Sequence, residues 1–278
     1  MKKSRKRKIT VVILIVLIVT ISCYWYFVVC FNMLKFTQIK GMEEYCQFSG
    51  YNKGENVKIA VLDSGVNANH QDLSENIKEG YDFIQNKVGV SDDCGHGTWI
   101  AGIIGASDNN IGICGIVPKA DIYPLKVLDD QGRGKIKNVV NAINWCIQED
   151  IDVVNISFST KKDDENLKKV VEEAVKKGII VVASYDNQEN KNSYPAQYEN
   201  VIGVKLGKKI DKVYTKEGIC YAPGCGVTTT DRGGVYEKVE GNSIATAYVT
   251  GNVALVVSKC KMNKESYNVD KIKKILMN

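Results

Sequence analysis

A polar loop changes into an apolar helical pattern in GNSIATAYVTG, residues 241–251. Ser243 stands at the change, where it would lie on the first turn of a helix with its side chain exposed. Unpaired backbone N–H groups and the positive end of the helix dipole favour a negatively charged oxygen there, which suits a nucleophile. The same place suits a helix N-cap, for which serine is a common residue. Partners elsewhere in the chain therefore decide between a nucleophile and a cap.

Two such partners occur earlier in the chain. The run VKIAVLDSG, residues 57–65, predicts a short buried strand that ends at Asp63 and turns at Gly65. The carboxyl end of a strand is where open α/β sheets bind their ligands. One of the chain's two histidines, His96, opens a second apolar helical stretch and lies between two glycines. Asp, His and Ser in this order match one of the known orders of a catalytic triad, so the nucleophile is favoured.

Strand and helix patterns alternate in the middle of the chain. Strands are predicted at residues 121–128, 151–157 and 178–184, and helices at 137–148 and 167–177. Strands that alternate with helices of this length indicate a mostly parallel sheet covered on both faces. The expected fold is therefore a three-layer α/β domain. No repeat, low-complexity tract or linker marks a second folded domain.

The segments around Asp63, His96 and Ser243 resemble the three signature blocks of the subtilisin-like serine proteases, and the resemblance runs from about residue 36 to 276. It implies that Ser243 is the nucleophile, His96 the general base and then acid, and Asp63 the group that orients His96. It also implies that Asn187 is the amide of the oxyanion hole. The expected activity is endopeptidase hydrolysis through an acyl-enzyme, on extracellular or exported peptides.

Several residues depart from the family pattern. The resemblance places Ser157, Ser159, Asp186 and Ser193 along the substrate cleft, but Asp186 replaces a usual glycine. A carboxylate in the S1 pocket would favour Lys or Arg at P1, unless Asp186 points to solvent. The other departures are Asn242 for Thr, Ile244 for Met, Ala247-Tyr248 for Pro-His, Ser159-Thr160 for glycines, and Trp99 for a second histidine. These changes indicate a specialised enzyme or, as the alternative, an inactive membrane-tethered binding module.

Two segments resemble the calcium-binding blocks of the family. HQDL, residues 70–73, contains Asp72, and SDNNIGI, residues 107–113, contains Asn109. A carboxylate, an amide and backbone carbonyls are oxygen ligands that suit Ca²⁺. We therefore expect a structural calcium ion held by Asp72 and Asn109, while an ordinary polar turn is the other interpretation.

The N-terminal segment has its own composition. Six of the 37 basic residues lie among the first eight positions, and the remaining 31 nearly balance the 32 acidic residues, so nucleic-acid binding has no support. Residues 9–31 carry no charge and as a helix would span roughly 35 Å. The expected organisation is a cytoplasmic tail at 1–8, a transmembrane anchor at 9–31 and a peptidase domain at 32–278 outside the cell membrane.

Two alternatives to the anchor are open. One is a cleaved signal peptide, although no convincing cleavage site follows the apolar run. The other is a lipid-modified Cys23, for which Thr20 is a poor match. About thirty residues separate the expected anchor from Asp63, so we also expect no propeptide of the usual family length.

Nine cysteines are many for an exported protein of this type. They show no metal-ligand spacing and no regular disulfide framework. Only Cys220 and Cys225 are close enough in sequence to suggest a disulfide. Cys23 and Cys30 lie in the expected anchor, and most of the others are expected to be buried thiols. Cys94 is the exception, because its place two residues from His96 predicts sensitivity to thiol reagents.

Overall fold

The computed structural model describes residues 17–26, 52–187, 192–208 and 213–276. The chain divides into a large unit, residues 40–109 and 113–278, and a small one, residues 1–39 and 110–112. In the small unit, residues 17–26 are helical and their side chains are exposed. Among the described residues, no helix has the length and apolarity that crossing a bilayer requires. The rest of the expected anchor at 9–31, and the tail at 1–8, lie outside the described residues.

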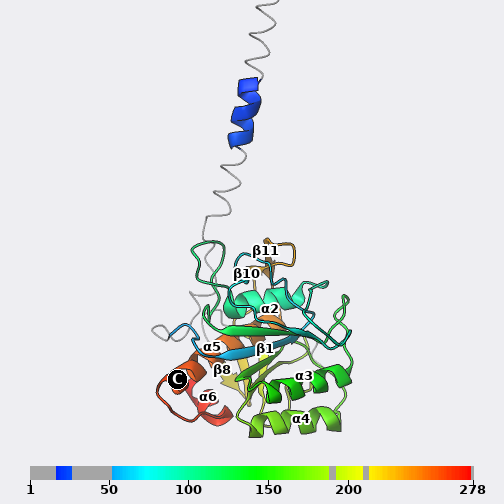
Figure 1. Ribbon diagram of the computed structural model, residues 1–278. Coiled ribbons are helices and arrows are strands. Elements are labelled where there is room, and N and C mark those ends of the chain that lie inside the picture. The colour runs from blue at the N-terminus through cyan, green and yellow to red at the C-terminus, as the bar shows by residue number, and fades with distance from the viewer. Residues whose placement is uncertain (1–16, 27–51, 188–191, 209–212, 277–278) are drawn as a thin grey trace, which may run out of the picture. The chain divides into compact units, whose positions relative to one another are not determined.

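A mostly parallel sheet forms the centre of the large unit (Figure 1). In the described residues its strand order is β3-β2-β4-β1-β5-β6-β7-β9-β8. The pairs from β2 to β9 are all parallel, and only the edge strands β3 and β8 run antiparallel to their neighbours. The strands are β1 (Lys58–Asp63), β2 (Tyr81–Asp82), β3 (Lys87–Val88), β4 (Asp121–Lys126), β5 (Val153–Ile156), β6 (Ile180–Ser184), β7 (Ile202–Leu206), β8 (Tyr214–Lys216) and β9 (Ile219–Ala222).

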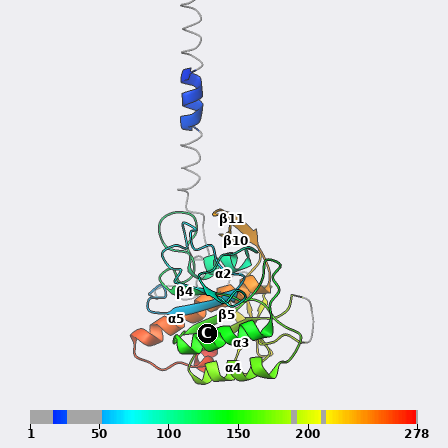
Figure 2. The same cartoon turned by 45° about the vertical axis from the view of Figure 1, so that its right-hand side comes forward.

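Helices cover both faces of this sheet, as Figures 1 and 2 show. One face packs against α3 (Ile136–Gln148) and α4 (Glu165–Lys176), and the other against α2 (His96–Gly105) and α5 (Asn242–Met262). Strand β1 serves both, because Ile59 and Val61 join one core cluster while Ala60 and Leu62 join the other. An unbroken apolar strand is the pattern expected of a sheet buried on both faces. The predicted three-layer α/β architecture is therefore confirmed.

The helices differ in how much of their surface is apolar. Helix α3 buries Val139, Ala142, Ile143 and Cys146, a single stripe at helical spacing, and leaves its other face to solvent. Asp164 is the N-cap of helix α4, and its carboxylate accepts hydrogen bonds from two backbone N–H groups of the first turn. Helix α5 is buried on all sides over most of its length, so it lies in the core rather than on it.

The predicted strands and helices of residues 121–184 agree with the structure to within two residues at each end. The antiparallel hairpin β10 (Val227–Thr230) and β11 (Tyr236–Val239) and the helix α6 (Val269–Leu276) have no counterpart in the prediction. The suggested disulfide is wrong, since Cys220 is a buried free thiol on β9 and Cys225 an exposed free thiol beyond that strand.

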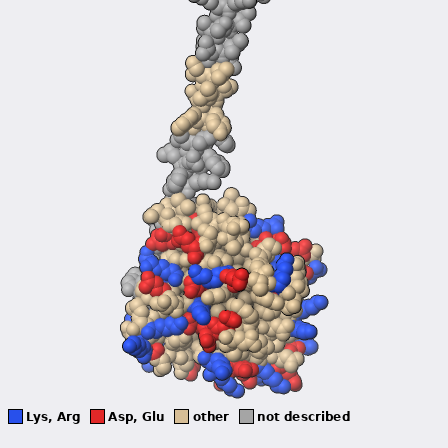
Figure 3. All heavy atoms as spheres, in the orientation of Figure 1, with Lys and Arg blue, Asp and Glu red and all other residues tan. Residues whose placement is uncertain are grey.

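Charge on the folded unit is mixed. In the face drawn in Figure 3, basic and acidic side chains alternate over the surface and no extended patch of one sign appears. This agrees with the near balance of charges that the sequence has after its first eight residues.

Candidate active site

The carboxyl ends of neighbouring parallel strands bring the candidate residues to one edge of the sheet. Asp63 is the last residue of β1, Ser157 follows β5, and Asn187 follows β6. These three strands are adjacent in the sheet. Helices α2 and α5 begin with the segments that carry His96 and Ser243 and pack on the same face of the sheet. The edge is the place where open α/β sheets bind ligands.

Asp63 and His96 form a close pair. The Asp63 side chain is fully buried, and its Oδ1 and Oδ2 lie 2.8 and 2.9 Å from Nδ1 of His96. The backbone N–H of Ser64 donates to the same Oδ1 at 2.8 Å. A buried carboxylate at Nδ1 fixes the imidazole with its proton on that nitrogen and directs Nε2 away from Asp63.

Electrostatics raise the pKa of His96 above its ordinary value. Burial, the largest influence, lowers it, but the charge of Asp63, the hydrogen bond that His96 donates to Asp63 and the charge of Asp92 together outweigh burial. The site therefore stabilises a protonated His96, which is the state that a general base reaches when it has accepted a proton.

Ser243 and Asn187 form a second group. Ser243 is partly exposed, whereas its neighbours Asn242 and Ile244 are buried. A Cβ placed on Gly241 would lie 3.7 Å from Ser243 Oγ and 3.6 Å from Asn187 Oδ1, so both side chains border the same space beside Gly241. Within the described residues, no hydrogen bond joins Ser243 to His96. Such bonds are often long before a substrate binds.

Asn242 connects this second group to the sheet. Its backbone N–H donates to Asn187 Oδ1 at 2.9 Å. Its side-chain Nδ2 donates to the carbonyls of Tyr185 and Asp186 at 3.1 and 2.9 Å, and its Oδ1 accepts from Leu206 N at 2.7 Å. Sequence reasoning identified Asn242 only as a departure from the family pattern. An amide at this position has the donors and the acceptor needed to bind two loops at once, which a single hydroxyl lacks.

Two of the predicted cleft residues, Ser157 and Ser193, have contacts that support the site. Ser157 is buried, and its hydroxyl donates to Asn155 Oδ1 at 2.9 Å and to the carbonyl of Ser243 at 3.3 Å. Ser193 is fully buried, and its Oγ accepts from Asp186 N at 3.1 Å. Their side chains therefore hold the nucleophile's backbone and the loop after β6. Asp186 is half-buried, and the peptide Tyr194-Pro195 is cis.

An apolar cavity of about 190 Å³ lies at the same end of the sheet. Ser159 and Thr160 form part of its wall, and Thr160 is bonded through its backbone to Tyr194 by two hydrogen bonds of 2.9 Å. The rest of the lining comes mainly from Leu128, Ile136, Val139, Phe158, Leu167 and Pro195. A cavity of this kind suits an apolar side chain of a bound peptide.

The expected calcium ligands lie on one part of the large unit. Asp72 is fully buried, and its Oδ2 accepts from Ile113 N and Tyr236 Oη, each at 2.9 Å. Its Oδ1 is buried without a hydrogen-bond partner within the described residues. Asn109 Nδ2 donates to the carbonyl of Gln71, the residue before Asp72, at 3.1 Å. A buried carboxylate oxygen without a donor fits a cation ligand, although the described residues contain no cluster of three or more His, Cys, Asp or Glu.

Comparison with known proteins identifies the family. A family model described as the subtilase family matches residues 54–278. The chain belongs to the subtilase family. Subtilisin NAT of Bacillus subtilis subsp. natto is 36% identical over 242 residues, which cover 80% of this chain and 60% of that protein. The subtilisin of Bacillus pumilus is 36% identical over 234 residues, which cover 80% of this chain and 83% of that protein. This subtilase thus spans about 60% of the length of subtilisin NAT.

Two further relatives are informative. The major intracellular serine protease of Bacillus subtilis (strain 168) is 35% identical over 222 residues, which cover 74% of this subtilase and 70% of that protein. The crystal structure of a cold adapted subtilisin-like serine proteinase superposes with a TM-score of 0.73 at 25% identity, covering 86% of this subtilase and 90% of that chain. The family resemblance and the subtilisin-like α/β fold that the sequence predicts are therefore confirmed.

Proposed function

We propose that this subtilase is a serine endopeptidase that uses Asp63, His96 and Ser243. The observation that carries the proposal is the contact of both buried Asp63 oxygens with His96 Nδ1. That contact prepares Nε2 to accept a proton, and Ser243 on the neighbouring helix α5 is the hydroxyl that supplies one. Family membership supports the same activity.

The reaction follows from these groups. His96 Nε2 removes the proton from Ser243 Oγ as Oγ forms a bond to the carbonyl carbon of the substrate. The protonated His96 then gives this proton to the departing amine when the peptide C–N bond breaks, and an acyl-enzyme remains. Water attacks the acyl-enzyme with the same base, which releases the carboxylic acid and restores Ser243. Asp63 stays ionised throughout and stabilises the imidazolium.

Asn187 is proposed as the amide that stabilises the oxyanion. Because Asn242 N–H is a donor, the atom of Asn187 that faces it is Oδ1, and Nδ2 is then the donor offered beside Ser243. The backbone N–H of Ser243, on the first turn of α5, is the second donor that we assign to the developing charge. The bond from Asn242 orients Asn187 before substrate arrives, so little reorganisation is needed.

The substrate is proposed to be an extended peptide that places one apolar side chain in the cavity beside Ser159 and Thr160. We further propose that Asp186 favours Lys or Arg at P1, because a half-buried carboxylate would pair with a cationic side chain. Cleavage of a peptide library tests both preferences. A set of products without enrichment of basic P1 residues would contradict the role of Asp186.

A calcium ion at Asp72 and Asn109 is proposed as a structural cofactor. The ion would supply the positive charge that the buried Oδ1 of Asp72 lacks among the described residues. Asp72 is also bonded to Tyr236 of β11, so the ion would link the turn at residues 70–73 with the β10–β11 hairpin. It takes no part in the peptide-bond chemistry.

The place of action is proposed from the sequence alone. The six basic residues among positions 2–8, followed by the uncharged run 9–31, support a chain that is anchored in the cell membrane with its peptidase domain outside. Digestion of intact cells with an added protease tests this, because only an external domain is degraded without lysis. Protection of the domain in intact cells would contradict it.

Labelling with a fluorophosphonate probe tests the peptidase proposal. The probe reacts with an activated serine, so the full-length chain is expected to be labelled and its Ser243→Ala variant is not. A folded chain that fails to react, with calcium present, would favour the inactive binding module. The intact pair of Asp63 and His96 is the observation that argues against that rival.

A further inference from the structure

One carboxylate in the loop before α2 collects an unusual number of hydrogen bonds. Asp92 Oδ1 accepts from Ser64 Oγ at 2.8 Å, Gly95 N at 2.7 Å and Cys94 N at 3.2 Å. Its Oδ2 accepts from Thr98 N at 2.8 Å and from Thr98 Oγ1 at 2.6 Å. Five donors occupy all the acceptor positions of a carboxylate, so Asp92 binds the backbone and side chains of this loop rather than water.

These bonds cap the helix that begins with His96. The N-cap residue Gly95 supplies no side-chain cap, and the first turn of α2 holds no acidic residue. Asp92 accepts the N–H of Thr98 instead, and the N–H of Gly97 donates to Ser64 Oγ at 3.0 Å. A negative charge at a helix N-terminus is stabilising. Asp92 thereby fixes the backbone from which the His96 side chain extends.

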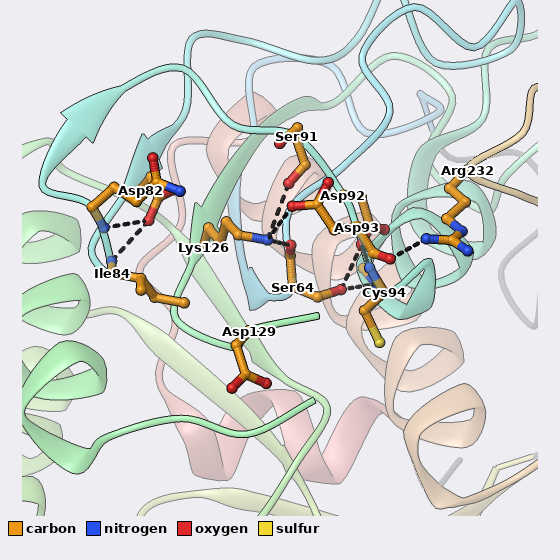
Figure 4. Close-up of polar contacts among 12 residues, drawn as sticks. Ser64, Asp82, Ile84, Ser91, Asp92, Asp93, Cys94, Lys126, Asp129 and Arg232 are labelled. Atoms are coloured by element: carbon orange, nitrogen blue, oxygen red, sulfur yellow. Dashed lines mark hydrogen bonds and ion pairs between the residues drawn. The ribbon is translucent and has the colours of Figure 1, made fainter. Parts of the chain in front are cut away.

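The same network reaches Asp63. Ser64 donates its N–H to Asp63 Oδ1 and its hydroxyl to Asp92, so the two carboxylates are joined through one residue. The buried Lys126 at the end of β4 donates to the carbonyls of Ser64 and Ser91, and Figure 4 shows its amine pointing toward both residues. Both partners of the Asp63–His96 contact are therefore held by Asp92 and its neighbours.

We propose that Asp92 is a positioning residue of this site: it holds His96 against Asp63 and adds a second negative charge beside the imidazole. The inference rests on the proposed peptidase function, in which His96 becomes protonated when Ser243 Oγ forms its bond to the substrate. Asp92 then stabilises the imidazolium together with Asp63, and it never touches the substrate.

The charges around His96 agree with this role. Burial lowers the pKa of His96, and the negative charges of Asp63 and Asp92 raise it above the ordinary value. The other titratable groups near this helix start are Asp93, Cys94, Lys126 and Arg232. Asp93 is 61% exposed at its side chain and pairs with Lys126 at 3.6 Å, and it is not among the groups that shift His96. It therefore provides a matched control.

The kinetic test compares Asp92→Asn with Asp93→Asn in the full-length chain, using a fluorogenic peptide. Each variant removes one negative charge from the same loop. We expect Asp92→Asn to lower kcat by about 10–100-fold, because misplaced catalytic groups cost rates of this order, with KM changed less than about threefold. Its acid limb of kcat/KM should move to lower pH, since the pKa of His96 falls. Asp93→Asn should stay close to the parent in both respects.

Two results would overturn the inference. One is an Asp92→Asn profile with the parent's acid limb and nearly the parent's kcat. The other is an equal effect of both variants, which would make any charge in the loop sufficient. Asp92→Glu separates geometry from charge. Because the charge is kept, its acid limb should lie closer to that of the parent than the acid limb of Asp92→Asn does. Its kcat should still fall, because the longer side chain cannot accept hydrogen bonds from all five donors.

A second measurement does not depend on activity. The chain has two histidines, so ¹³C-histidine labelling of the Ser243→Ala chain allows NMR titration of His96. Its pKa should be lower in the Asp92→Asn variant and unchanged in Asp93→Asn. This result stands even for a chain that cleaves no peptide, so failure of the proposed function and failure of the inference are distinguishable.

A further variant covers the case in which Asp92→Asn does not fold. Thr98→Val keeps the shape of its side chain and removes one donor to Asp92 Oδ2, together with the acceptor of the Asn67 N–H. It should weaken the downfield ¹H signal of the His96 Nδ1–H that is shared with Asp63, and lower kcat severalfold. An unchanged signal and rate would show that the Asp92 network does not position the base.

Discussion

Replacing Asn242 with alanine tests how the site is held together. Asn242 is only 8% exposed, and its side chain makes three hydrogen bonds, to Leu206 N, Tyr185 O and Asp186 O. In Asn242→Ala these three backbone groups lose their partner in a buried place. At about 1 kcal/mol of net stability for each bond, the free energy of unfolding should fall by about 3 kcal/mol. The loss is greater if the groups remain without water.

Urea unfolding of the full-length chain, followed by circular dichroism in a Ser243→Ala background, measures this change without self-digestion. The matched control is Asn141→Ala, the same substitution on the exposed face of α3, which should change stability by less than about 0.5 kcal/mol. In the active background, kcat of Asn242→Ala should fall at least about tenfold, because the loop that carries Asn187 loses its two bonds to the Asn242 side chain and keeps only the backbone bond from Asn242 N–H to Asn187 Oδ1. A stability change below about 1 kcal/mol would refute the reasoning. It would mean that the three bonds are replaced elsewhere.

Three further predictions concern the base, a close backbone contact and the proposed ion. Burial lowers the pKa of His96, but Asp63 and Asp92 raise it by more than burial lowers it, so the pKa lies above the ordinary histidine value of about 6.5. Because the base must be neutral to act, kcat/KM should rise with pH through a value above about 6.5. An acid limb below this pH in a pH–rate profile would contradict the assignment. Gly97→Ala would place a Cβ 2.0 Å from the Gly65 carbonyl oxygen and 3.1 Å from Asp63 Cβ, so α2 must move away from the turn after β1. Tm in a thermal-shift assay and kcat from initial rates should therefore both fall. An unchanged Tm would show that the two segments separate at no cost in stability. Removal of calcium with EGTA should lower Tm, because an ion that binds only the folded state stabilises that state. In Asp72→Asn, Tm should be the same in calcium and in EGTA. If EGTA lowers Tm equally in the parent and in the variant, Asp72 is not a ligand.

The sequence was sufficient for the parts of the molecule that local patterns determine. The buried strand that ends at Asp63 and the helix that begins at His96 are visible as an apolar run with a polar or glycine boundary. The stripe of α3 is visible in its helical spacing. The order of the three signature blocks then indicated the family without any coordinates, and the comparisons confirm it.

The remaining features depend on how distant segments meet. Nothing in the local sequence says that the hydroxyl of Ser157 turns toward Asn155 and the carbonyl of Ser243, or that Ser193 is buried beneath Asp186. Asp92 likewise looks like one more acid of a polar loop until its partner Ser64, 28 residues earlier, is known. The edge strands β3 and β8 are only two and three residues long, too short for a periodic signal.

The suggestion of a disulfide failed for a related reason. Only four residues lie between Cys220 and Cys225, but the end of strand β9 is among them. Cys220 points into the core, where burial raises the pKa of its thiol to about 12, and Cys225 lies at the surface with its thiol bonded to Glu240 at 3.2 Å. Short spacing in sequence is no guide to pairing when the chain changes from strand to loop.

The position of α5 in the chain sets an order of events during synthesis. This helix is the most deeply buried of the described helices and packs against α2, β5, β6 and β7, all of which precede it in sequence. More than 240 residues must therefore be synthesised before α5 can pack into the core. Until then the parallel strands have one face without this covering helix. Ser243 arrives in that same segment. A growing chain therefore lacks Ser243, and cannot cleave itself or neighbouring chains with it, until synthesis has reached the helix at the centre of its core.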